Sequence, residues 1–277
     1  LEKLAQEAKK LGLVGIDLIG AEGWDVLKKY DLTSTMCYGD IEGKSTRSLK
    51  NGWCDKRFHK DLISHYKRHI KLVSDAGWKN LICFSGNRRG MNDEEGLKNC
   101  IEGLSQIIPV AEENNVKMAI HPDDPPIPLF GVPRIVSTYE DYKFILDSYN
   151  SESNGMTFCS GSLASNIHND IYKIFNKFKE KVNFIHLRNV IIEKDKKSFY
   201  ESNHLNGDVD FVKLIKMILK EEKRRSKNKK VNIPMRPDHG HALLDDQRKK
   251  TFNPGYTAIG RLMGLSELRG IIKAVQN

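Results

Sequence analysis

The feature that most restricts the fold of this chain is a regular alternation of helix-forming and strand-forming segments. Segments with apolar residues at helical spacing are expected at residues 1–11, 23–30, 56–76, 94–113, 139–148, 169–178 and 209–222. Each is followed by a short apolar, β-rich run, at residues 13–19, 33–37, 80–84, 116–120, 156–158, 182–185 and 231–235. Such alternation is typical of a parallel sheet whose strands are connected by helices.

The sheet could be closed into a barrel or open with helices on both faces. No Gly-x-Gly-x-x-Gly or P-loop segment follows any expected strand, which argues against an open nucleotide-binding sheet. A chain of 277 residues suits a (β/α)8 TIM barrel, which typically has about 250 residues in one domain. We therefore predict an α/β chain folded as one TIM-barrel domain over residues 1–277. Because the pattern begins with a helix and yields seven strands, the first strand of the barrel is apparently missing.

Composition indicates the environment of the protein. The chain is 39% hydrophobic and 29% charged, which is enough apolar material for a sizeable core. It has no uninterrupted apolar run of membrane-spanning length, and it opens with Leu-Glu-Lys-Leu rather than an export signal. The five cysteines are an odd number without Cys-x-x-Cys spacing, which fits a reducing compartment. We therefore expect a cytoplasmic protein with no membrane partner.

The net charge of +9 could attract an anionic partner. Much of the charge lies in the tract at residues 220–230, which we interpret as a solvated helix end and loop. Binding of single-stranded nucleic acid favours aromatic residues among the basic ones, and this tract has none. Nucleic acid is therefore not the expected partner.

Four consecutive expected strands end in residues that can bind a metal: His121, Cys159, His186 and Asp238. The carboxyl ends of parallel barrel strands carry the active site, and neighbouring strands lie roughly 5 Å apart, so these side chains can converge. Two imidazoles, a thiol and a carboxylate suit a divalent first-row transition ion better than Mg²⁺ or Ca²⁺. Ligand types alone do not select the ion, although six-coordinate Mn²⁺ or Fe²⁺ would keep two positions open for substrate.

Further polar residues lie near these ends and could bind substrate or transfer protons. They are Arg188, Asn189, His204, Arg236, His239, His241 and Tyr256. Arg236 could equally hold a structural carboxylate, and His204 could simply be a solvated loop residue. Asp123 and Asp124 could support a metal ligand or form a turn.

From residue 116 onward, the chain resembles the bacterial mannonate dehydratase family. The resemblance rests on His121-Pro-Asp-Asp-Pro-Pro126, Gly131-Val-Pro-Arg-Ile135, Gly155-Met-Thr-Phe-Cys159-Ser-Gly-Ser162, His186-Leu-Arg-Asn-Val190, His204-Leu-Asn-Gly-Asp208, Pro234-Met-Arg-Pro-Asp-His-Gly-His241 and Asn253-Pro-Gly-Tyr-Thr-Ala-Ile-Gly-Arg261. It implies a xylose isomerase-like TIM barrel that binds Mn²⁺ or Fe²⁺ through His121, Cys159, His186 and Asp238. His239 and Tyr256 fall where the family has its proton-transfer groups. Arg188, Asn189, His204, Arg236 and His241 are then expected to bind the substrate.

The first 115 residues resemble hydroxypyruvate isomerase-like proteins of the same barrel superfamily, through Leu1 to Cys37, Ile82-Cys-Phe-Ser-Gly-Asn-Arg-Arg-Gly-Met91 and Gly96-Leu-Lys-Asn-Cys100. The activity implied by the mannonate dehydratase resemblance is dehydration of D-mannonate to 2-keto-3-deoxygluconate in hexuronate breakdown. The alternatives are a sugar or hydroxypyruvate isomerase, a hybrid barrel with little activity, and a metal-dependent nuclease barrel. Unpaired strand edges next to the missing strand would favour weak activity and association into homo-oligomers.

Overall fold

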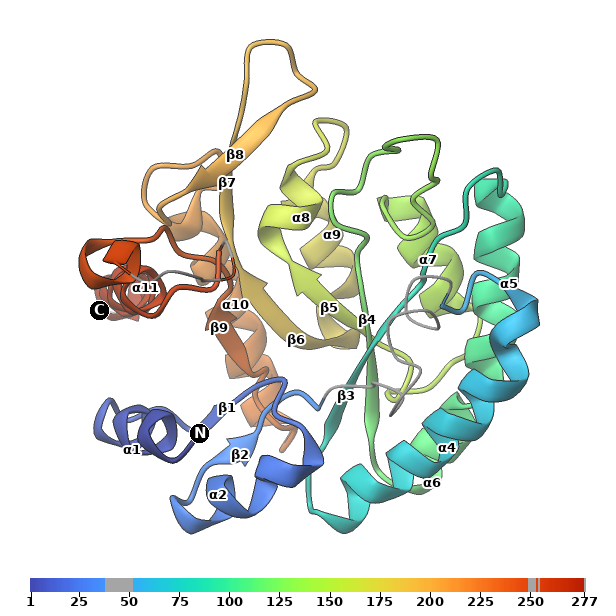
Figure 1. The fold of residues 1–277 in the computed structure, drawn as a ribbon, viewed down its shortest axis with the longest axis horizontal. Helices are drawn as coiled ribbons and strands as arrows, with labels where there is room; N and C mark the ends of the chain where they lie inside the picture. The colour runs from blue at the N-terminus through green and yellow to red at the C-terminus, as the bar shows by residue number, and fades with distance from the viewer. Residues whose placement is uncertain (38–51, 249–252, 254, 277) are drawn as a thin grey trace. The chain divides into compact units, whose positions relative to one another are not determined.

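A computed structural model of the protein describes residues 1–37, 52–248, 253 and 255–276 (Figure 1). Its strands are β1 (Gly15–Ile16), β2 (Thr33–Ser34), β3 (Asn80–Phe84), β4 (Lys117–His121), β5 (Met156–Cys159), β6 (Val182–Leu187), β7 (Asn189–Ile192), β8 (Phe199–Ser202) and β9 (Met235–Pro237). Its α-helices are α1 (Glu2–Lys10), α2 (Trp24–Lys29), α4 (His59–Asp75), α5 (Asp93–Ser105), α6 (Ile108–Glu113), α7 (Tyr139–Asp147), α8 (Ser160–Ala164), α9 (Ile171–Phe178), α10 (Phe211–Lys227) and α11 (Ala258–Gln276). The sequence predicts a polar loop from the end of the strand at residues 33–37 through Trp53, and residues 38–51 of that loop lie outside the described residues, as does Pro254.

The alternation of helix and strand expected from the sequence is confirmed, and the strands that alternate with helices pair in parallel. The described strands form a five-stranded sheet in the order β3-β4-β5-β6-β9 and two-stranded sheets β1-β2 and β7-β8. The chain divides into two compact units. One comprises Leu1–Asp123, Pro128–Val136 and Glu140–Thr157, and the other comprises Asp124–Ile127, Ser137–Tyr139 and Phe158–Asn277.

In the first unit, β3 and β4 pair in parallel from Asn80 opposite Lys117 to Phe84 opposite His121. Both strands are almost fully buried, as expected for strands covered on both faces. Helices α4 and α6 pack against each other, and α4 also packs against β3 (Figure 1). This packing fixes the carboxyl end of β4, where the first expected metal ligand lies.

The single helix expected at residues 94–113 is wrong, because the structure has two helices there. Helix α5 begins after Asn92, whose side-chain oxygen accepts hydrogen bonds from the backbone N–H groups of Glu94 and Glu95 at 2.8 and 3.3 Å. Helix α6 has Pro109 in its first turn. Proline is tolerated there because its missing N–H has no partner within the helix, whereas inside a longer helix it would break a hydrogen bond.

In the second unit, β6 pairs in parallel with β9, with Ile185 opposite Met235 and Leu187 opposite Pro237. The strand expected at residues 231–235 therefore lies later in the chain, and Val231 is 70% exposed. The antiparallel hairpin β7–β8 was not predicted from the sequence. It follows β6 after one residue and extends beyond the end of that strand (Figure 1).

The basic tract at residues 220–230 is only partly solvated. Helix α10 runs on to Lys227, and most lysines of the tract are exposed as expected. Glu221 and Arg225 are buried instead, and the Arg225 guanidinium donates to Glu221 at 3.0 Å and to the Val182 carbonyl at 2.9 Å. Part of the tract thus anchors α10 to the start of β6. No helix in the described part of the chain combines the length and apolar character needed to cross a membrane.

Candidate metal and proton-transfer site

Three of the four expected metal ligands lie together in the second unit. Cys159 is the last residue of β5, His186 is near the end of β6, and Asp238 directly follows β9. All three are buried. The Asp238 carboxylate lies 3.7 Å from the Cys159 sulfur and 3.8 Å from His186 Nδ1. The parallel pairing of β6 with β9 accounts for this, because it brings the ends of the two strands to the same level.

The fourth expected ligand, His121, is the last residue of β4 and is also buried. Its Nδ1 lies 2.6 Å from the Pro122 carbonyl oxygen, which can only accept a hydrogen bond, so Nδ1 carries the proton and Nε2 can act as a ligand. Strand β4 pairs with β5 through Ile120 and Met156, and β5 then leads to Cys159. Among the described residues, His121, Cys159 and His186 form a candidate set of metal ligands.

The donor set fits a divalent first-row transition ion. It offers imidazole nitrogen, sulfur and carboxylate oxygen, whereas Mg²⁺ and Ca²⁺ prefer oxygen ligands alone. Burial, together with the nearby Asp238 carboxylate, raises the pKa of the Cys159 thiol to about 12. A bound cation would reverse this preference, because a thiol that coordinates a metal ion is deprotonated.

The Asp238 carboxylate is held by Arg236, two residues earlier in the sequence. Arg236 Nη1 lies 2.8 Å from Asp238 Oδ1 and donates to the Asp238 carbonyl at 3.1 Å. The sequence left open whether Arg236 holds a structural carboxylate or a substrate. In the structure it pairs with the carboxylate expected to bind the metal.

The two expected proton-transfer residues lie side by side. The rings of His239 and Tyr256 are 5.0 Å apart in an edge-to-face arrangement, and His239 Nε2 lies 3.7 Å from Asp238 Oδ2. A parallel bridge between Gly240 and Tyr256 fixes this contact, together with a 2.8 Å hydrogen bond from the Gly240 N–H to the Gly255 carbonyl. Partial burial, together with the charge of Asp238, raises the pKa of Tyr256 above its usual value, so the phenol keeps its proton at neutral pH.

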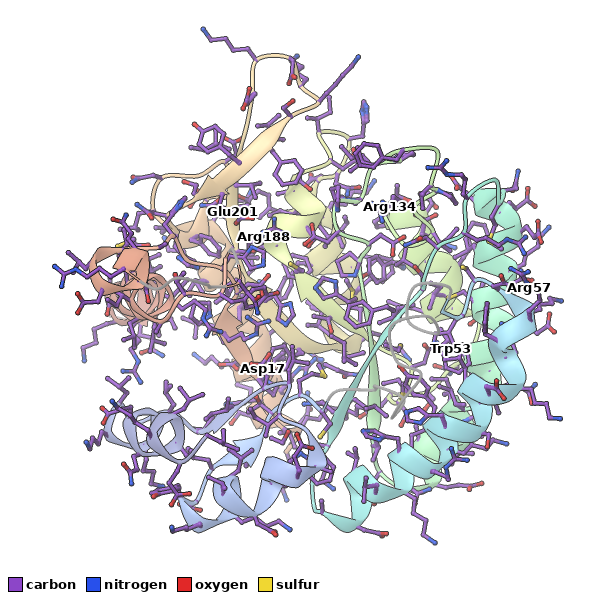
Figure 2. The ribbon with its side chains drawn as sticks, in the orientation of Figure 1. Asp17, Trp53, Arg57, Arg134, Arg188 and Glu201 are labelled. Atoms are coloured by element: carbon purple, nitrogen blue, oxygen red, sulfur yellow. The ribbon has the colours of Figure 1, made fainter. Side chains whose placement is uncertain are left out.

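Sequence reasoning missed Glu201 on β8, which joins two of the expected residues. Arg188 is buried, and its Nε donates to both Glu201 carboxylate oxygens at 3.0 and 3.1 Å. Its Nη1 donates to Asp124 at 2.8 Å. Glu201 also lies 3.0 Å from His239 Nδ1, and Figure 2 shows it beside Arg188 at the base of the hairpin. A signal existed, since the apolar residues 190–192 and 199–200 flank a polar turn and predict a hairpin.

The other expected substrate-binding residues have different surroundings. The buried Asn189 amide donates to the carbonyls of His204 and Val209 at 2.9 and 3.0 Å. His204 is buried rather than solvated, and its Nε2 lies 2.9 Å from the Leu187 carbonyl. His241 is exposed. Of the two aspartates that the sequence left open, Asp123 accepts a hydrogen bond from the Ile135 N–H at 2.6 Å and so anchors a loop.

The comparison with solved structures shows which class of fold the chain has. It aligns with a xylose isomerase domain protein from Planctomyces limnophilus with a TM-score of 0.67 and 12% identity, over 99% of this chain and 92% of that one. It aligns with a mannonate dehydratase from Streptococcus suis serotype 2 with a TM-score of 0.76 and 27% identity, over 91% of this chain and 81% of that one. The expected fold, a xylose isomerase-like TIM barrel, is confirmed.

The family follows from the sequence match. The family model described as D-mannonate dehydratase (UxuA) matches residues 85–277, and the chain belongs to this family. Mannonate dehydratase 2 of Agrobacterium fabrum is 49% identical over 179 residues, which are 64% of this chain and 45% of that protein. The chain thus spans less than half the length of the curated relatives it matches. The predicted family is confirmed, and its match begins upstream of Val116.

Proposed function

We propose that this protein dehydrates D-mannonate to 2-keto-3-deoxygluconate in the cytoplasmic breakdown of hexuronates. One observation carries the proposal. In a member of the D-mannonate dehydratase family, a buried nitrogen, sulfur and oxygen donor set lies next to two proton-transfer groups, His239 and Tyr256. A dehydration next to a carboxylate needs both components.

The ligands for Mn²⁺ or Fe²⁺ would be His121, Cys159, His186 and Asp238. When bound, such an ion stabilises negative charge that develops on a carboxylate next to the carbon losing its proton. Arg236 holds the Asp238 carboxylate in place through the 2.8 Å ion pair, so that its oxygens face Cys159 and His186.

The proton transfers would be divided between His239 and Tyr256. His239 would take the proton from C2 at Nε2, the nitrogen nearer to Asp238. Tyr256 would donate a proton to the departing C3 hydroxyl. Its raised pKa supports this role, because the phenol holds its proton at neutral pH. The edge-to-face contact of the two rings keeps both groups beside the metal ligands.

The substrate would contact the accessible members of the expected set. His241 is exposed and Arg236 lies beside Asp238, so both could bind hydroxyl or carboxylate groups of the sugar acid. Three other members, Arg188, Asn189 and His204, would support the site without contacting the substrate, because their polar atoms bond to protein groups.

Turnover of D-mannonate by the purified chain with Mn²⁺, measured as formation of the 2-keto acid, tests the proposal. We expect turnover that His239→Asn lowers by about 10² to 10⁴. His168→Asn changes an exposed histidine in the second unit and serves as the control. Absence of keto acid from D-mannonate, together with isomerisation of hydroxypyruvate, would replace this function with that of an isomerase.

A further inference from the structure

We propose that Glu201 is a positioning residue that fixes the tautomer and orientation of the His239 imidazole. The inference deepens the function proposed above, on which its catalytic consequence rests. It starts from a chain of three side chains: buried Arg188 on one side of the Glu201 carboxylate and His239 on the other. All three lie in the second unit.

The first step is the charge of Glu201. Arg188 is always protonated and buried, and it donates from Nε to both carboxylate oxygens at 3.0 and 3.1 Å. A cation fixed at this distance in a buried setting favours the ionised carboxylate. Asp124 at 2.8 Å and Ser162 at 3.3 Å hold Arg188 Nη1, so the guanidinium is fixed from both ends.

The second step is the hydrogen bond to His239. An ionised carboxylate can only accept, so the 3.0 Å contact between Glu201 Oε1 and His239 Nδ1 requires a proton on Nδ1. In the neutral imidazole, Nε2 then carries the lone pair. Nε2 is the nitrogen 3.7 Å from Asp238 Oδ2, on the side of the candidate metal ligands. Glu201 therefore makes the ring nitrogen nearer to those ligands the one that can accept a proton.

In this arrangement, the hairpin β7–β8 supplies the carboxylate that contacts His239. Its register places Glu201 opposite Val190, three residues after the end of β6. The Asn189 side chain secures the same region by accepting from the Val209 N–H and donating to the His204 carbonyl, both at 2.9 Å. The hairpin, whose turn at residues 193–198 is exposed, is thus anchored where it supplies a carboxylate to the site.

Nitrogen NMR of the full chain, selectively labelled with ¹⁵N-histidine and freed of paramagnetic ions with a chelator, tests the tautomer directly. His239→Gln identifies the resonances. In the spectrum of the neutral imidazole, reached by raising the pH until the His239 resonances no longer move, we expect His239 to carry its proton on Nδ1. Glu201→Ala should move the proton to Nε2, which free imidazole prefers in water. Glu193→Ala, a change in the same hairpin away from His239, should leave the spectrum of His239 unchanged.

Wild-type His239 protonated on Nε2, or a Glu201→Ala spectrum like the wild type, overturns the inference. If Glu201→Ala does not fold, the wild-type tautomer alone decides. With D-mannonate, Glu201→Ala should lower kcat by about 10²-fold with little change in KM, because substrate binding is not its role. A raised KM with unchanged kcat would also contradict the inference. If wild type does not turn over D-mannonate, the proposed function fails, while the tautomer is still decided by NMR.

Discussion

Gly240 offers the sharpest test of how the candidate site is built. It lies between His239 and His241, and it packs directly on the first turn of α11. A Cβ at this position would lie 2.3 Å from the carbonyl carbon of Gly260 and 2.5 Å from the backbone nitrogen of Arg261. Ordinary contacts between such atoms are about 3.5–4.0 Å. Since both neighbours are backbone atoms, Gly240→Ala must push the segment away from α11 by about 1 Å.

The size of the effect follows from this displacement. Overpacking of this kind typically costs about 1–3 kcal/mol, and each kcal/mol lowers Tm by roughly 2–4 °C in a chain near this size. Displacing His239 by about 1 Å can lower turnover by about 10²-fold. Gly270→Ala is the matched control on α11, because a Cβ there meets nothing within 4 Å. Alanine should stabilise that exposed helical position by about 0.5–1 kcal/mol.

Thermal unfolding of the two variants, followed by circular dichroism, should therefore change Tm in opposite directions. Turnover of D-mannonate should fall only in Gly240→Ala. Equal or higher stability of Gly240→Ala, or unchanged turnover, would show that the contact between residues 240 and 260 does not fix His239.

Three further changes test other parts of the structure. Cys159→Ala should weaken Mn²⁺ binding by at least about 10-fold, measured by elemental analysis after dialysis, whereas Cys100→Ala on α5 should not. Glu221→Ala leaves the buried Arg225 without its carboxylate and should cost about 3–5 kcal/mol in urea unfolding, unlike a change at an exposed lysine of the same helix. Asp195 accepts hydrogen bonds from two turn amides, which lower its pKa to about 2. Its contribution to the hairpin should be present above the unfolded pKa of about 3.9 and be lost as the pH falls through 2, visible in the shifts of those amides and absent in Asp195→Asn.

The order of helices and strands could be predicted because burial leaves a periodic pattern in the sequence. Strand β3 occupies the predicted residues, and helix α7 begins at the predicted residue. The position of β9 could not be predicted in the same way. Val231 to Met235 is apolar enough for a buried strand, but pairing with β6 selects Met235–Pro237, which includes a charged residue. Register between distant strands depends on contacts that the local pattern does not contain.

The grouping of the candidate metal ligands was predictable for a different reason. In a parallel sheet, the carboxyl ends of the strands lie along the same edge, so residues at these ends can be grouped from the sequence alone. The group of His121, Cys159 and His186 was predicted in this way. Arg188 and Glu201 show where this reasoning stops. Arg188 follows the end of β6 and was expected to bind substrate, and in the structure its guanidinium donates to Glu201 and Asp124. The end of a strand fixes the backbone position of a residue. Which group a long side chain binds depends on the charged residues around it.

The short segment from Arg236 to His241 contacts several parts of the candidate site. Arg236 holds the carboxylate of Asp238, His239 contacts both Tyr256 and Glu201, and Gly240 brings the backbone against α11. Because neighbouring residues in an extended chain point in opposite directions, one short segment can face the metal ligands with some side chains and the hairpin with others. A shift of this segment would therefore change the candidate metal site and the contact between His239 and Tyr256 together. That is why a single methyl group at position 240 should affect stability and turnover at once.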